Sequence, residues 1–342
     1  SGNHSVQAET LGGYRWRNVR IMGAASGVGM NLIDSHVDLS QFTEPENVHR
    51  VRSADRFKKR TLDVLAHRGA AIGAPMPWLK SRDLIELRPG ELSIWTGYKG
   101  HGKSQMISQV MLHVMRLNNR VLIISPEFKP EEVLARKCRQ ESGSARPPEK
   151  FVDDWFAYAS NRLWLFDHQG ALQADNVVAL CRYAVATFQI NHIVIDSLMK
   201  CGIGVGADDY TKQKHFVDKL QSVAHQSGPH IHLVAHARKG ASDESPPGLH
   251  DVKGTSEIGD MAENVFSVWR NKPKHKAMSA GDQSKGNEPD AILTCESQRN
   301  GSGWNGAMQF WFDPQSGQFL ESLNDNARCY QPAGLSVEVV EF

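Results

Sequence analysis

A glycine-rich segment between residues 92 and 105, LSIWTGYKGHGKSQ, limits the fold more than any other part of the sequence. It opens with an apolar run, LSIWT, and continues through Gly97, Gly100 and Gly102 into Lys103 and Ser104. This is the spacing GxxxxGKS, placed between an expected strand and an expected helix. The segment therefore predicts a phosphate-binding loop at the start of a helix, inside an α/β domain.

The residue types of this loop match the chemistry of phosphate binding. Glycines allow the backbone N–H groups to wrap around phosphate oxygens at the N-terminus of a helix. Lys103 is expected to reach the β- and γ-phosphates, and the hydroxyl of Ser104 to bind Mg²⁺. Gln105 follows directly and belongs to the same predicted nucleotide site.

Short apolar runs alternate with apolar-faced helical segments from Glu91 onward. The expected strands lie at residues 92–96, 120–125, 162–166, 192–196 and 230–235, and the expected helices at 105–117, 176–188 and 215–226. This alternation predicts a mostly parallel, twisted sheet with helices on both faces, which is the α/β class. Three later runs, at 264–269, 291–297 and 307–312, predict further strands, some of them antiparallel.

Two acidic residues follow expected strands and should meet the loop at one edge of the sheet. Asp196 ends the run HIVID, and a carboxylate there can hold Mg²⁺ through water. Glu127 follows the run VLIIS and can deprotonate an attacking water. Glu127 could equally serve as the N-cap or first-turn acid of the next helix, PEEVLARKC, and its position alone does not separate these two roles.

Composition excludes several classes of protein. The net charge of the 342 residues is +1 at pH 7, so a nucleic-acid contact would have to be local. The 5 cysteines are scattered without a CxxC pair, which argues against a zinc site and a disulfide framework. No apolar run approaches the ~20 residues of a membrane span, and no signal peptide is visible. We therefore expect a protein without a membrane partner in a reduced, cytoplasmic setting.

The flanking segments are less informative. Residues 1–42 are expected to be an extension, and GAASGVG within it is interpreted as a loop because no Lys-Ser/Thr follows it. Residues 43–80 are expected to form a linker helix, over about 43–68, and a connector; Thr43 and Glu46 provide a capping box. The ATPase domain is expected over 81–322 and a tail over 323–342. The absence of an initial methionine is typical of a piece of a longer protein.

The stretch from Glu91 to about Leu320 resembles the ATPase domain of hexameric replicative helicases, a group that includes DnaB, phage primase-helicases and Twinkle. Six segments carry the resemblance in the family's order: ELSIWTGYKGHGKS, SPEFKPEEV, HIVIDSL, HIHLVAHARKG, VKGTSEIGDMAENVFSVWRNK and SQRNGSG. RecA-type recombinases share the first three and not the last two. The resemblance implies a RecA-like fold and a site for ATP and Mg²⁺.

The resemblance also implies roles for single residues. Glu127 matches the catalytic base, His236 the γ-phosphate sensor, and Arg299 an arginine finger supplied to the neighbouring subunit. Lys253, Gly254 and Thr255 match the loop that follows single-stranded DNA, and Arg270 and Phe312 match residues that sandwich adenine. One departure is Ser297, where relatives often carry a lysine. The structural alternatives are a surface ion pair for each arginine and a packed core residue for His236.

These observations lead to one functional hypothesis and its rivals. The main hypothesis is a hexameric ring that translocates on single-stranded DNA and unwinds duplex by hydrolysing ATP at subunit interfaces. A primase and a DNA polymerase are candidate partners; the end VEVVEF resembles a polymerase-docking tail, or is an edge strand. The rivals are a RecA-like ATPase that does not unwind, such as a recombinase, a switch or a structural filament, and an assembly factor without a DNA role.

Overall fold

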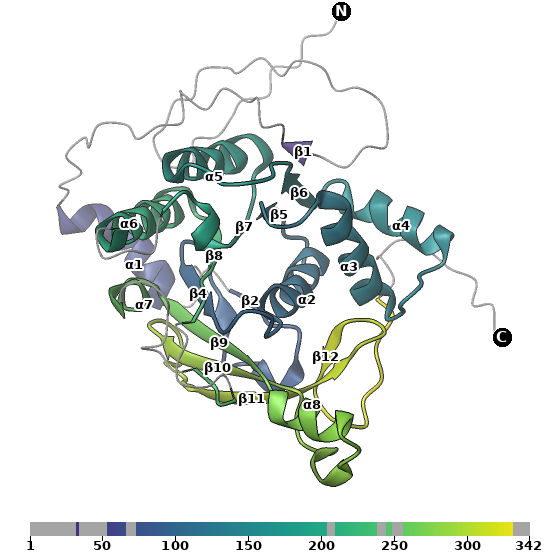
Figure 1. Cartoon of the computed structure of the whole chain (residues 1–342). Coiled ribbons are helices and arrows are strands. Elements are labelled where there is room, and N and C mark those ends of the chain that lie inside the picture. The colour runs from purple at the N-terminus through teal and green to yellow at the C-terminus, as the bar shows by residue number, and fades with distance from the viewer. Residues whose placement is uncertain are drawn as a thin grey trace, which may run out of the picture.

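The computed structural model describes residues 32–33, 53–65, 73–203, 209–237, 244–247 and 256–330. A ten-stranded sheet in the order β1-β6-β5-β7-β8-β4-β9-β10-β11-β12 crosses this part of the chain, and β2 pairs with β3 in a small second sheet (Figure 1). The strands are β1 Leu32–Ile33, β2 Ala74–Pro75, β3 Glu86–Leu87, β4 Leu92–Thr96, β5 Val121–Ile124, β6 Leu163–Phe166, β7 His192–Asp196, β8 His230–Val234, β9 Asn264–Arg270, β10 Ala291–Gln298, β11 Gly306–Asp313 and β12 Gln318–Leu320.

The sheet is parallel from β1 to β9 and antiparallel beyond. Strands β1, β6, β5, β7, β8, β4 and β9 pair in parallel along that order. Strands β9 to β12 then pair as an antiparallel meander. The five predicted core strands and the three later ones are all present. The predicted mostly parallel sheet with an antiparallel addition is therefore confirmed.

Helices cover both faces of the sheet, as predicted (Figure 1). They are α1 Lys58–Leu65, α2 Lys103–Arg116, α3 Pro130–Ser142, α4 Glu149–Ala159, α5 Ala174–Phe188, α6 Tyr210–Ser227, α7 Ser256–Met261 and α8 Lys272–Ser279. Successive strand residues point to opposite faces. Ile94 accordingly packs in the core beneath α5 and α6, whereas Trp95 packs in the core beneath α2.

Two helices lie outside the predicted set. The first, α4, buries Trp155 and Ala159 against the α2 side of the sheet. The second, α8, has little apolar surface and is held by polar contacts instead. The side chain of Asn271 accepts from Lys274 N at its N-terminus, and Lys274 Nζ lies 2.8 Å from Asp290 Oδ1. Such contacts depend on a distant strand, so local periodicity does not reveal α8.

The predicted linker helix is described only in part. A 3₁₀ turn, Ala54–Phe57, leads into α1, so this portion is helical as expected. Residues 34–52 and 66–72 lie outside the described residues. The following connector packs on the large domain: Met76 and Trp78 are 3% exposed, and Trp78 Nε1 donates to Phe319 O at 2.9 Å. No described helix is both long enough and apolar enough to cross a bilayer.

Part of the expected tail also lies against the domain. Gln318 Nε2 donates to Arg328 O at 2.7 Å, and Arg328 N donates back to Gln318 Oε1 at 2.9 Å. Tyr330 N donates to Glu141 O at 2.7 Å, which brings the chain to the end of α3. Residues 331–342, including VEVVEF, lie outside the described residues. The domain boundaries given above stay predictions.

Candidate active site

Four adjacent strand ends create the candidate site. Strands β5, β7, β8 and β4 are neighbours and run parallel, so their carboxyl ends meet at one edge of the sheet. Glu127, Asp196, His236 and Gly97 lie at or just beyond these four ends, in that order across the sheet. Ligands of open α/β sheets bind at this edge. The fold therefore brings together the residues that the sequence assigns to phosphate chemistry.

The glycines of the loop are required by backbone conformation and by close packing. Gly97 has φ of 145°, and a Cβ there would lie 2.3 Å from Val268 O of β9. Gly102 has φ of 87° and forms the N-cap of α2, where a Cβ would lie 3.3 Å from the Phe319 ring. At Gly100, also at positive φ, a Cβ would meet no atom within 4 Å, so that position faces open space. The loop is a backbone cradle in which side chains are excluded at two points.

Lys103 lies across the loop at the centre of the cradle. Its side chain is buried, and Nζ donates to Gly97 O at 2.7 Å and to Tyr98 O at 3.0 Å. Burial lowers the pKa of Lys103 to about 8, and the charges of Asp196 and Glu127 act in the opposite direction. The ammonium is thus held beside two carboxylates, where a phosphate can be received.

Ser104 and Asp196 form a pair of oxygen donors. Ser104 Oγ donates to Asp196 Oδ2 at 2.5 Å, and burial raises the pKa of Asp196 although this hydrogen bond opposes the effect. In the described part of the chain no group of three or more His, Cys, Asp or Glu could hold a metal ion. A hydroxyl and a carboxylate nevertheless fit Mg²⁺, which takes few protein ligands and completes its shell with water and phosphate oxygens.

Glu127 is not part of a helix start. Helix α3 has Lys129 as its N-cap, and the acids of its first turn are Glu131 and Glu132. Glu127 instead lies exposed in the turn after β5, where Oε1 accepts from Ser197 Oγ at 3.2 Å. The alternative role as a helix-start acid is therefore excluded. Ser197 directly follows Asp196, so this contact holds the Glu127 carboxylate beside the Ser104–Asp196 pair.

His236 is attached to the phosphate-binding loop through both its backbone and its ring. The adjacent Ala237 N donates to Gly97 O at 2.9 Å, and the half-buried His236 ring places Nδ1 3.4 Å from Lys103 Nζ. An ammonium can only donate, so Nδ1 acts as the acceptor and neutral His236 carries its proton on Nε2. A proton on Nε2 is what a sensor needs to donate to a phosphate oxygen.

A second hollow adjoins the loop on the β9 side. Strand pairing sets Ala291 opposite both Arg270 and Phe310, so these residues and Phe312, two positions on, lie on one face. Arg270 and Phe312 line this hollow together. The other residues lining it are Gly100, His101, Gly102, Gln105, His275, Asp290, Ala291 and Phe319. A guanidinium and an aromatic ring beside a phosphate loop are suited to enclose a base.

Arg299 lies at the opposite edge of the sheet. Asn264 at the start of β9 pairs with Gln298, the last residue of β10, whereas Arg270 at the other end of β9 lines the base hollow. Six residues of strand separate Asn264 from Arg270, which is about 20 Å at ~3.3 Å per residue. Arg299 is exposed and follows Gln298 directly. Its side chain therefore does not reach the nucleotide edge of its own subunit.

The structure adds residues that the sequence did not single out. Arg136 and Lys137 of α3 line a hollow together with Ser104 and Asp196. Lys137 is 1% exposed, Nζ donates to Ser108 Oγ at 3.1 Å, and burial lowers its pKa to about 8. Neither cation belongs to a recognisable local motif. The predicted DNA loop, Lys253, Gly254 and Thr255, lies outside the described residues.

A comparison with known protein families agrees with this geometry. The sequence profile described as AAA domain matches residues 53–242, more than half of the chain. The chain belongs to this family. The match spans the phosphate-binding loop, Glu127, Asp196 and His236, and ends before β9.

Solved structures show which fold of AAA domain this is. The isolated ATPase domain of one helicase matches with a TM-score of 0.64 and 14% identity, covering 79% of this chain and 99% of that one. A DnaB-like replicative helicase that interacts with primase matches with a TM-score of 0.64 and 13% identity, covering 79% of this chain and 68% of that one. The AAA domain of this chain therefore has the RecA-like fold of helicase ATPase domains.

Proposed function

We propose that the protein is an ATP-dependent DNA helicase motor whose active sites lie between subunits. One observation carries this proposal: the phosphate loop, Asp196, Glu127 and His236 meet at one sheet edge, whereas Arg299 lies about 20 Å away at the other. A single chain is therefore half of two sites. The fold shared with helicase ATPase domains supports the same conclusion.

In the proposed reaction, water attacks the γ-phosphorus of ATP and releases ADP and phosphate. Glu127, oriented by Ser197, accepts the proton of the attacking water. Lys103 offsets the charge of the β- and γ-phosphates, and Mg²⁺ on Ser104 and Asp196 supplies Lewis-acid stabilisation of that charge. Arg299 from the next subunit offsets the remaining charge of the transition state.

The same proposal assigns the base hollow to adenine. Arg270 and Phe312 flank it from two strands separated by β10, and strands lie about 4.8 Å apart. The resulting gap of roughly 10 Å between backbones accommodates a flat ring between a guanidinium and an aromatic face. Stacking of this kind stabilises the bound nucleotide without contacting the reacting phosphate.

A ring of subunits around single-stranded DNA completes the proposal. Lys253, Gly254 and Thr255 precede α7 and are proposed to follow the DNA backbone in the channel. Hexameric assembly and partnership with a primase or a DNA polymerase are part of the same hypothesis. One solved structural relative, the DnaB-like replicative helicase, interacts with primase, and that partnership is proposed for this chain by similarity of fold.

Strand displacement on a forked DNA substrate tests the proposal. Wild-type protein should hydrolyse ATP faster with single-stranded DNA and should separate the fork, whereas Lys103→Ala should do neither, because no other loop cation reaches the phosphates. Stimulated hydrolysis without strand separation would favour a RecA-like ATPase that does not unwind. Hydrolysis unaffected by DNA would contradict a DNA motor altogether.

A further inference from the structure

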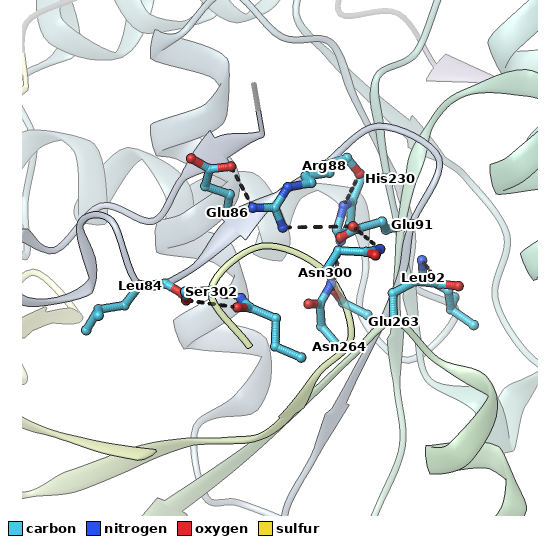
Figure 2. A network of polar contacts seen from close by, with 12 residues as sticks. Leu84, Glu86, Arg88, Glu91, Leu92, His230, Glu263, Asn264, Asn300 and Ser302 are labelled. Atoms are coloured by element: carbon cyan, nitrogen blue, oxygen red, sulfur yellow. Dashed lines mark hydrogen bonds and ion pairs between the residues drawn. The ribbon is translucent and has the colours of Figure 1, made fainter. Parts of the chain in front are cut away.

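The loop that carries Arg299 is clamped to the body of the domain by a polar network (Figure 2). The loop joins β10 to β11, and Arg299 N donates to Glu263 O at 2.8 Å. The next residue, Asn300, donates from Nδ2 to Glu91 Oε1 at 2.8 Å. These two bonds fix the backbone on either side of the Arg299 side chain, which itself stays exposed.

Glu91 is the centre of the network. It is 4% exposed, and its other oxygen, Oε2, accepts from Asn264 Nδ2 at 3.0 Å. Arg88 Nη1 lies 3.9 Å from Oε1, and Arg88 Nη2 is held by Glu86 at 2.8 Å. A buried carboxylate needs such partners, because an unpaired charge in this environment is costly. Asn300 supplies the shortest of these contacts to Oε1.

Packing leaves the loop little freedom to move away from Arg88. Gly301 has φ of 76°, and a Cβ at this position would lie 2.4 Å from Arg88 Nη2. The guanidinium of Arg88 thus lies directly against the loop backbone, as Figure 2 shows for Arg88, Glu91 and Asn300. On the far side, Ser302 Oγ donates to Leu84 O at 3.3 Å. The loop is held from two directions by the segment between residues 84 and 91.

We propose that Glu91 is a positioning residue that fixes, through Asn300, the direction in which Arg299 is presented to the neighbouring subunit. The inference rests on the proposed role of Arg299 as a finger and goes beyond it. Glu91 immediately precedes β4, and the other end of β4 becomes the phosphate-binding loop. A single short strand thereby links a subunit's own nucleotide site rigidly to the finger that it offers to the next one.

A swap of the hydrogen-bonding groups tests this inference. Asn300→Asp removes the donor and sets two carboxylates against each other, so we expect kcat for ATP to fall on the order of tenfold to a hundredfold, as small misplacements of a catalytic group do. KM for ATP should stay within about twofold, because the finger acts in the transition state. Adding Glu91→Gln should restore most of the rate, since the introduced amide can donate to the introduced carboxylate and its oxygen can still accept from Asn264.

Two comparisons make the result decisive. Asn119→Asp is the matched control: Asn119 is half-buried in a loop and donates to Val114 O at 3.1 Å, so its loss should change melting temperature without changing kcat. Asn300→Ala, which adds no charge, should show a smaller fall in kcat than Asn300→Asp and replaces it if that variant does not fold.

The remaining outcomes separate the two proposals. A normal kcat in Asn300→Asp together with a low kcat in Arg299→Ala would overturn the positioning role and leave the finger intact. Failure of Glu91→Gln to restore the rate of Asn300→Asp would overturn Glu91 as the partner. A normal kcat in Arg299→Ala would remove the finger itself, and with it the proposed shared site.

Discussion

Three buried histidines at the start of β7 and β8 predict a steep loss of stability in mild acid. The rings of His230 and His232 have centroids 4.5 Å apart, and those of His192 and His232 5.5 Å apart. All three are at most 3% exposed. Trp95 Nε1 donates to His232 Nδ1 at 3.2 Å, and His230 Nδ1 lies 2.7 Å from Arg88 O. The cluster is hydrogen-bonded in its neutral form.

The direction of the effect follows from the pKa values. Burial lowers the pKa of His230 to about 4, although the hydrogen bond to Arg88 O opposes this, and burial lowers the pKa values of His192 and His232 as well. In the unfolded chain a histidine has a pKa near ~6.5. Between these values the unfolded chain binds protons that the folded chain does not. The stabilisation is therefore complete above about pH 6.5 and is lost as the pH falls toward 4.

The size of the effect can be estimated for His230 alone. Each pH unit between the folded and unfolded pKa values corresponds to about 1.4 kcal/mol, which gives about 3 kcal/mol in full and about 2 kcal/mol between pH 8 and pH 5. Urea unfolding at these two pH values measures it. His230→Asn retains a donor for Arg88 O without titrating, so it should be less stable at pH 8 but should lose about 2 kcal/mol less on acidification. An equal loss in both proteins would refute the assignment.

Three substitutions test the nucleotide site itself. Glu127→Gln should still bind ATP but should hydrolyse it on the order of 10²-fold more slowly or worse, because the water has lost its base; near-normal turnover would show that Glu127 is not the base. Phe312→Ala should raise KM for ATP more than it lowers kcat, the pattern of lost uniform binding, and an unchanged KM would rule out the adenine sandwich. His236→Ala should leave the melting temperature nearly intact and reduce the ratio of ATPase rates with and without single-stranded DNA. A large fall in melting temperature with an unchanged ratio would instead identify a packing histidine.

Much of the parallel core could be predicted from sequence because its signals are local. A run such as HIVID, apolar throughout its centre, matches a strand buried on both faces, and its terminal Asp196 then falls at the ligand edge. The loop GxxxxGKS fixes its own backbone through glycines, so Lys103 and Ser104 could be placed without knowledge of the sheet. The described part of the chain has these residues where the motif puts them.

What could not be predicted depends on the order of the strands. The sequence offered two roles for Glu127, and only the position of Lys129 as the N-cap of α3 excluded one of them. The distance of Arg299 from its own nucleotide follows from β9 lying beside β4 and from β10 running back along it. Lys137 is buried only because α3 packs on α2, and no pattern within its own helix marks it. Helix α4 is different, since Phe151, Trp155 and Ala159 recur every four residues and could have predicted it.

The shared active site is tested most directly by mixing two inactive variants. Arg299→Ala retains its phosphate-binding loop and lacks the finger, whereas Lys103→Ala retains the finger and lacks a working loop. A site shared between subunits predicts that each variant alone is inactive and that mixtures recover ATPase activity, because a Lys103→Ala subunit offers Arg299 to the nucleotide of an Arg299→Ala neighbour. Affinity tags on the two chains verify that mixed assemblies form. Mixed assemblies that remain inactive at every ratio would contradict the shared site.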